Sequence, residues 1–232
     1  MTKSRCIAVF GLAVCLLIIV GCRSNGTYPY GHYKDQEMVG FVSSIDLDNR
    51  NLTVDISEWE KRHTRGPDIN DYGVELQVQL TPSVNIHKEN GDSASASDLR
   101  VGQKVELKPA HTKSSKEPPK EIIILTIRQE EALERLGLFA RGKGSIHVTI
   151  LGDESSAPLN QKIMDQFLNE AGSGLQGGVS SMMYQPEYIV DLKKIYGIQR
   201  FPTILLFDQE KLLLQTEDVG EAIRYITAKN KS

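Results

Sequence analysis

The sequence predicts an α+β protein with two folded domains, an all-β domain followed by an α/β domain. Three observations lead to this prediction. Through residues 37–128, apolar and polar residues alternate with a period of two, which is typical of strands with one buried face. From residue 145 onward, β-branched runs are separated by apolar stripes at helical spacing. The length of 232 residues is sufficient for two small hydrophobic cores.

The N-terminus has the features of an export signal. Lys3 and Arg5 precede a run of 16 uncharged residues at positions 6–21, CIAVFGLAVCLLIIVG. A helix needs about 20 apolar residues to cross a bilayer, so this shorter run predicts a signal peptide over residues 1–21. Residues 22–36 contain Gly, Pro, Asn and Ser without apolar periodicity, which predicts a tether.

The end of the uncharged run, Ile19-Val20-Gly21-Cys22, resembles the lipobox of bacterial lipoproteins. In that family the cysteine thiol receives a diacylglyceryl group and the chain is cleaved before the cysteine. The resemblance implies lipidation of Cys22 and a lipid-anchored location at the cell membrane, on its extracytoplasmic face. Two or more acyl chains hold a protein stably on a bilayer, whereas one does so only marginally. The alternative is an uncleaved signal anchor with an incidental cysteine.

Residues 37–128 are predicted to form a small barrel or sandwich of short strands. Leu52, Val54 and Ile56 alternate with polar residues, and the same period returns further along the chain. No helical period is visible in this half. Trp59 is interpreted either as packing over the mouth of the barrel or as an exposed contact residue. The predicted strands cover residues 39–45, 52–56, 74–80, 84–87, 104–108 and 121–127.

The order of these segments and the residues after them define the first domain. A hairpin, a polar excursion, a strand, then DLRVGQKVEL and a final strand together resemble the OB-like barrels of secreted bacterial lipoproteins. This resemblance implies an OB-like small β-barrel over residues 37–128. Residues 129–144 are predicted to be a helical linker, because EEALERLG forms a short helix ending at Gly137 and RGKG then marks the domain boundary.

Residues 145–232 are predicted to form an α/β domain in the order β-α-β-α-β-β-α. The continuous β-branched run at 146–151 is typical of a central strand buried on both faces. Ser155 and Ser156 are predicted to cap the first helix, and Thr216 is predicted to cap the last. The remaining elements are a helix from Pro186 to Gly197 and strands at 179–183, 203–207 and 211–215.

The segments Tyr196-Gly197-Ile198 and Phe201-Pro202-Thr203 are similar to the thioredoxin-like fold, in which a helix ends in such a triplet and a cis-proline with a following threonine precedes a strand. The resemblance implies a thioredoxin-like domain over residues 145–232 and a cis Phe201–Pro202 bond. It also implies that Phe201, Pro202 and Thr203 form a peptide-binding loop, since relatives pair with an extended client there. The alternative is a stable module in which Pro202 is a structural turn.

The sequence departs from redox-active relatives at the position of their Cys-X-X-Cys motif. Residues 152–158, GDESSAP, contain no thiol, and no cysteine follows Cys22. A serine hydroxyl cannot take part in disulfide exchange, so the thioredoxin-like domain is predicted to lack active-site cysteines and redox activity.

Other catalytic and ligand-binding patterns are missing from the sequence. The five histidines are dispersed, without the pairing of a zinc site, and Ser155 and Ser156 lack a Gly-X-Ser-X-Gly elbow. The formal net charge of −3 excludes a strong nucleic-acid footprint. We therefore predict no catalytic residue, no cofactor, no metal ligand and no nucleic-acid partner.

Together these features predict a non-catalytic, lipid-anchored extracytoplasmic protein with a binding or envelope-assembly role. Its partners would be the membrane, through the lipid on Cys22, and another envelope protein or a cell-wall polymer. The whole chain resembles small lipoproteins of Gram-positive bacteria, some of them peptidoglycan-associated. Two alternatives remain: a hydrolase or other enzyme whose site is assembled from dispersed residues, and a structural spacer of the envelope.

Overall fold

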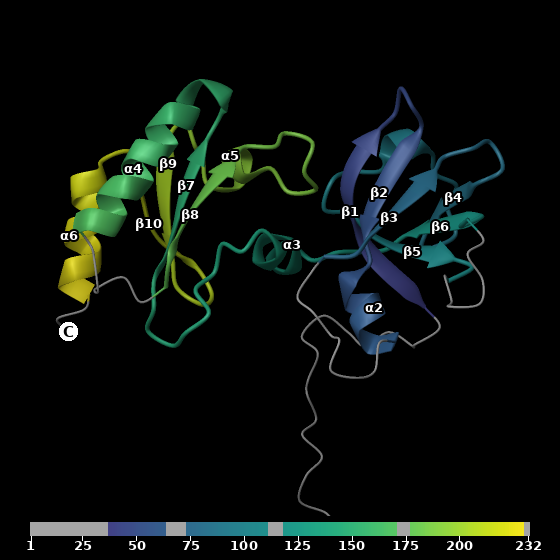
Figure 1. Ribbon diagram of the computed structural model, residues 1–232, viewed down its shortest axis with the longest axis horizontal. Helices are drawn as coiled ribbons and strands as arrows, with labels where there is room; N and C mark the ends of the chain where they lie inside the picture. Colours follow the sequence, from purple (N-terminus) through teal and green to yellow (C-terminus); the bar gives the residue numbers. More distant parts are fainter. Residues whose placement is uncertain (1–36, 64–72, 111–117, 171–176, 230–232) are drawn as a thin grey trace, which may run out of the picture. The chain divides into compact units, whose positions relative to one another are not determined.

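The protein was analysed as a computed structural model, which describes residues 37–63, 73–110, 118–170 and 177–229. These residues form a mixed α/β structure with two sheets (Figure 1). The predicted signal peptide, the tether and Cys22 lie outside the described residues. Within the described ranges, no helix is long and apolar enough to span a bilayer.

The first sheet has six strands in the order β3-β2-β1-β5-β6-β4. All of its pairs are antiparallel except β4–β6, which is parallel. Every strand predicted in residues 37–128 is present, so the alternation of apolar and polar residues predicted the strands correctly. The strands are β1 (Met38–Asp46), β2 (Asn51–Asp55), β3 (Glu75–Gln79), β4 (Asn85–Lys88), β5 (Lys104–Lys108) and β6 (Glu121–Ile124).

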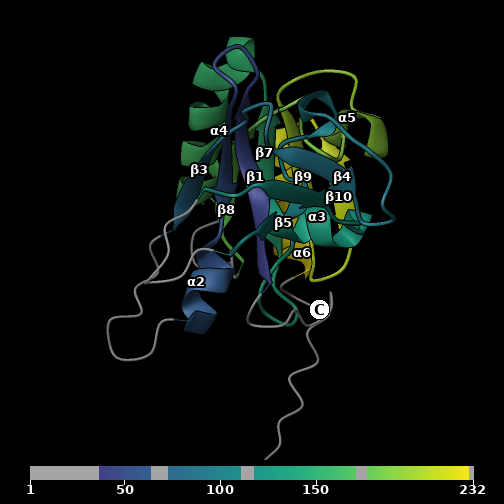
Figure 2. The same ribbon diagram turned by 90° about the vertical axis from the view of Figure 1, so that its right-hand side faces the viewer.

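A helix in this half, α2 (Ser57–His63), was not predicted. It lies at one end of β1 in both views (Figures 1 and 2). Asp55 accepts a hydrogen bond from the backbone N–H of Ser57 (2.9 Å), and Trp59 is buried in the core of the first sheet. The prediction failed because a helix of seven residues with one apolar side chain has no stripe to recognise. Trp59 is thus a packing residue, and the exposed-contact interpretation was wrong.

The second sheet has four strands in the order β10-β9-β7-β8, with β7–β8 parallel and the other pairs antiparallel. Its strands are β7 (His147–Gly152), β8 (Val179–Met183), β9 (Thr203–Phe207) and β10 (Leu212–Thr216). Helices α4 (Ala157–Glu170) and α6 (Val219–Lys229) cover one face, and α5 (Leu192–Ile195) lies on the other (Figure 1). All five residues of β9 are buried, as expected of a central strand.

Three details of the second domain differ from prediction. The helix expected from Pro186 is only the four residues of α5, because Asp191 caps it by accepting a hydrogen bond from the Lys194 N–H (3.1 Å). At the turn before α4, the cap residue is Asp153, and the predicted Ser156 is its partner in a reciprocal capping box. Asp218, and not Thr216, accepts hydrogen bonds from the first N–H groups of α6. At Asp153 and Asp218, a carboxylate accepts the capping hydrogen bonds that were expected of a hydroxyl. At Asp191, a carboxylate caps a helix that begins later than predicted.

The predicted linker contains α3 (Gln129–Arg135), which is packed against both sheets. Glu131 forms a buried ion pair with Lys104 of β5, with 2.6 Å between Oε1 and Nζ. Arg135 bonds Asp55 (3.2 Å) and stacks on the ring of Phe41, 3.3 Å from its centroid. The following apolar residues, including Leu138, belong to the core beneath the second sheet. This helix therefore has its charged side on the first sheet and its apolar side on the second.

Candidate functional site

The register of the second sheet brings together two loops that the sequence singled out. Leu151 of β7 pairs with Thr203 of β9, so the loop after Gly152 and the loop ending at Pro202 meet at the same end of the sheet. The backbone N–H of Tyr184, just after β8, donates to the carbonyl of Gly152 (2.7 Å). The loop that follows Gly152, predicted to lie at the Cys-X-X-Cys position of redox-active relatives, and the predicted peptide-binding loop are therefore neighbours.

The two serines of the first loop are held in capping hydrogen bonds. The Asp153 carboxylate accepts from the Ser156 N–H (2.9 Å) and from the Ser155 hydroxyl (2.7 Å), while Ser156 Oγ accepts from the Asp153 N–H (2.7 Å). The hydrogen bond from Ser155 is the main cause that holds the pKa of Asp153 below its ordinary value. This carboxylate orients the loop, and its lowered pKa makes it a weak base toward Ser155.

The Phe201–Pro202 bond is cis, as predicted. The Phe201 ring is half-buried, with its centroid 5.4 Å from that of Tyr184 and 5.5 Å from Lys193 Nζ. Thr203 is buried and its hydroxyl donates to the Arg200 carbonyl (2.6 Å). No hydrogen bond joins the backbone N–H or C=O of Phe201 to any residue within the described ranges. The loop thus presents main-chain groups, while its side chains are used for packing.

Among the described residues, no histidine forms a hydrogen bond with Ser155 or Ser156. His147 begins β7, whereas the serines follow the end of that strand. Its ring nitrogens are 2.9 Å from the Gly177 carbonyl and 2.9 Å from Ser180 Oγ, so it is a hydrogen-bonded structural residue. Over the residues that the structure covers, no three His, Cys, Asp or Glu side chains are grouped to hold a metal ion.

His87 joins the parallel strands β4 and β6 and carries a pH-dependent contact. Its Nε2 lies 2.7 Å from Glu121 Oε1, and its Nδ1 lies 3.1 Å from the Lys88 carbonyl. The hydrogen bond with Glu121 is the largest cause that raises the pKa of His87 above its ordinary value, followed by the contact with the Lys88 carbonyl. Both ring nitrogens face acceptors, so folding favours the protonated ring.

We expect the stability difference between wild type and His87→Gln to depend on pH. A histidine whose pKa is raised on folding contributes fully below its unfolded pKa, about 6.5, and this contribution is lost as the pH rises through the folded pKa. Urea unfolding at a series of pH values should therefore show a difference that is largest in mild acid and shrinks toward alkaline pH. Glu121→Gln should remove the same pH dependence. If the difference in the free energy of unfolding were the same at every pH, the pKa of His87 would not change on folding.

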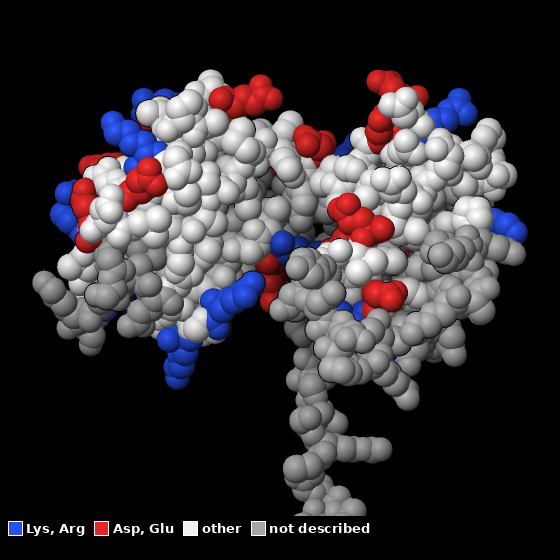
Figure 3. Space-filling view, viewed as in Figure 1, with Lys and Arg blue, Asp and Glu red and all other residues white. Residues whose placement is uncertain are grey.

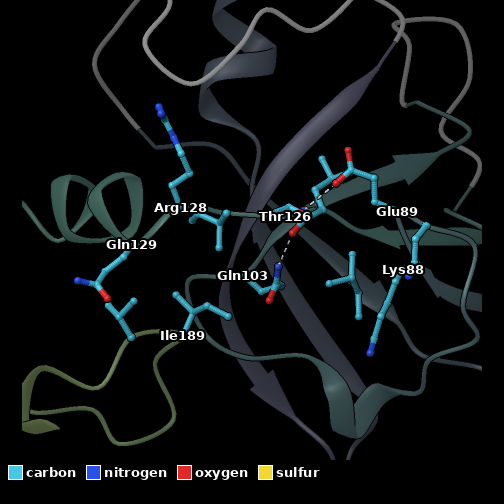
Figure 4. A pocket seen from close by; sticks show the side chains of 12 residues that line it. Lys88, Glu89, Gln103, Thr126, Arg128, Gln129 and Ile189 are labelled. Carbon is cyan, nitrogen blue, oxygen red and sulfur yellow. Dashed lines mark hydrogen bonds between the residues drawn. The ribbon is translucent and has the colours of Figure 1, made fainter. Parts of the chain in front are cut away.

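A cleft of about 690 Å³ was not predicted from the sequence. Figure 4 shows it between the end of β6, the loop after β4 and the segment before α5. Its lining residues are Lys88, Glu89, Asn90, Gln103, residues 124–129, Ile189 and Val190. They come from four separate stretches of the chain, so no local motif could reveal them.

Gln103 is the buried polar group of this cleft, with 6% of its surface exposed. Its Nε2 donates to the carbonyls of Leu125 (2.8 Å) and Lys104 (3.2 Å). These two bonds fix the amide, and its oxygen is turned away from them (Figure 4). Lys88 and Arg128 stand on opposite sides of the cleft in the same view. Elsewhere, on the face drawn in Figure 3, basic and acidic groups are scattered without one sign dominating.

Comparison with known proteins adds little. No protein family and no curated protein matches the chain. Among solved structures, a thioredoxin of Malassezia sympodialis (Mala s 13), described as a member of a pan-allergen family, is similar to 45% of this chain over 90% of its own length. The sequence identity is 14% and the TM-score is 0.30. A similarity this weak supports no conclusion about activity.

Proposed function

We propose that this chain is an exported lipoprotein, anchored through Cys22 to the extracytoplasmic face of the cell membrane, that binds an envelope protein without catalysis. In this proposal residues 37–128 form an OB-like barrel and residues 145–232 a thioredoxin-like domain without active-site cysteines. The six short strands of the first sheet support the first assignment, although its edge strands β3 and β4 are not paired with each other. The strand order β10-β9-β7-β8, with α4 and α6 on one face, supports the second.

The observation that carries the binding role is the main chain of Phe201. Its N–H and C=O have no partner among the described residues, while its ring is fixed against Tyr184. An extended peptide can pair with such groups as an added strand, and a fixed loop loses little conformational entropy on binding. With no cysteine after Cys22, the contact would be non-covalent.

The alternative functions, a hydrolase, a polymer-binding protein and a structural spacer, require different properties of the Asp153 loop and the Phe201 loop. A hydrolase would need an effective base near Ser155 or Ser156, and the carboxylate that accepts from Ser155, that of Asp153, has a lowered pKa and is a weak base. A cell-wall polymer would replace the protein partner, and a spacer would have no partner at all. The geometry therefore favours a peptide client at the Phe201-Pro202-Thr203 loop.

Site-specific photo-crosslinking in intact cells tests this proposal. A photoreactive residue at Arg200, whose side chain is 78% exposed, should yield an adduct with a discrete envelope protein. The same residue at Lys162, exposed on α4, serves as the control and should not. Phe201→Pro removes the backbone N–H and should abolish the adduct. Phe201→Leu keeps the N–H while losing the ring and should retain it.

Three outcomes would contradict the proposal. Equal adducts from positions 200 and 162 would show that the loop is not the contact. Equal effects of Phe201→Pro and Phe201→Leu would show that the main chain is not used. An adduct that is released by digestion of the cell wall would identify a polymer as the partner.

A further inference from the structure

We propose that the cleft around Gln103 is a second binding site, distinct from the Phe201 loop, and that it takes an acidic peptide in extended conformation. The cleft volume of about 690 Å³ is within the range of about 300–1,000 Å³ that is usual for ligand sites. The ligand class follows from three features of its lining: an acceptor held in a fixed orientation, a backbone residue without hydrogen-bond partners among the described residues, and an excess of one basic residue over acidic ones.

The fixed acceptor is the side-chain oxygen of Gln103. The two bonds from Nε2 to the Leu125 and Lys104 carbonyls hold the amide plane, so the oxygen cannot exchange places with the nitrogen without losing both. No residue of the described chain donates to this oxygen, and Gln103 is 6% exposed. The oxygen is not fully buried and reaches the cleft, where the N–H of a ligand would replace water as its donor.

The unpaired backbone lies just after β6. Leu125 N–H donates to the Lys104 carbonyl and Thr126 N–H donates to the Glu89 carboxylate, both at 3.0 Å. The next residue, Ile127, has neither its N–H nor its C=O bonded to any described residue. Arg128 continues in an extended conformation (φ −80°, ψ 150°). An antiparallel strand exchanges both hydrogen bonds with a single opposing residue, and Ile127 offers that donor and acceptor pair.

The charge of the lining favours an acidic ligand. Two basic residues, Lys88 and Arg128, and one acidic residue, Glu89, line the cleft, which leaves an excess of one positive charge. Apolar walls are supplied by Ile127, Ile189 and Val190, which suit the alternate side chains of an extended peptide. None of the lining residues is aromatic, so a nucleotide base has no ring on which to stack.

Fluorescence anisotropy with a labelled peptide of alternating valine and aspartate tests the site. The full chain is used, purified in a non-ionic detergent, and a valine–lysine peptide of the same length is the comparison. Wild type should bind the acidic peptide more tightly. Lys88→Glu should weaken that binding by roughly tenfold or more and improve binding of the basic peptide. The matched control Lys162→Glu, with the same charge change on exposed α4, should leave both affinities unchanged.

Hydrogen exchange provides an independent readout of strand addition. The amide of Ile127 should exchange more slowly when the acidic peptide is bound, because its N–H is then paired. Equal affinities for the two peptides, equal effects of Lys88→Glu and Lys162→Glu, or unchanged exchange at Ile127 would each overturn the inference. Phe201→Pro should leave this binding intact, so failure here and failure of the proposed function can be told apart.

Discussion

Replacing Glu131 by alanine should lower the free energy of unfolding by about 3–5 kcal/mol, measured by urea denaturation. Glu131 pairs with Lys104 at 2.6 Å, and the two side chains are 6% and 3% exposed. The substitution removes the Glu131 carboxylate from the buried Lys104 ammonium, and the loss of one partner from a buried ion pair is among the most costly changes in a protein. Lys104 Nζ is also 5.7 Å from the Phe41 ring centroid, a contact too weak to replace an ion pair.

The double variant Lys104→Met with Glu131→Leu is the control for this prediction. It removes both charges and keeps similar volumes, so it should recover most of the lost stability or exceed wild type. Arg135→Ala on the same helix breaks pairs with Asp55 and Glu58 that are partly exposed, and should cost less than Glu131→Ala. If Glu131→Ala cost no more than Arg135→Ala, the buried pair would not be what holds α3 to the first sheet.

The sequence was a good guide wherever burial follows a period. In β2, Leu52 and Val54 are buried while Asn51 is exposed, and this alternation alone predicts a strand with one wet face. In β9, all five residues are buried, which matches its continuous apolar run. Both patterns are local, because a strand shows its two faces in its own residues.

Features that depend on distant partners were not predictable. Lys104 is 2% exposed at the start of β5, and nothing in its neighbours shows that Glu131 of α3 neutralises it. The helix α2 has too few apolar residues to form a stripe. The predicted helix from Pro186 was shortened because Asp191 caps a later start, which periodicity does not reveal. Side-chain hydrogen bonds decided these boundaries.

The two candidate sites differ in the same way. The loop at Phe201, Pro202 and Thr203 could be predicted from its residues. Only the register of β7 against β9 shows that it adjoins the Asp153 loop. The cleft around Gln103 could not be named, since residues before β5, after β6 and before α5 meet there only in the folded chain. Its decisive feature, the orientation of one amide, is set by two backbone carbonyls.

Replacing Cys22 by alanine should release the protein from the membrane fraction and abolish its labelling by radioactive fatty acid. The proposal that Cys22 carries the lipid makes acyl chains the anchor, and stable attachment takes two or more of them. The uncharged run of residues 6–21 is a weak substitute. As a helix it would be about 24 Å long, whereas the hydrocarbon core is about 30 Å thick. Cell fractionation and metabolic labelling measure the two effects separately.

Cys15→Ala is the matched control for this prediction, because it removes a thiol from within the same uncharged run. If the chain is cleaved before Cys22, the lipid is attached C-terminal to position 15, and this variant should keep full labelling and full membrane retention. Retention of Cys22→Ala together with loss of label would mean that the uncharged run stays on the chain and holds it in the bilayer. Unchanged labelling of Cys22→Ala would place the acyl group elsewhere and remove the basis for the lipoprotein assignment.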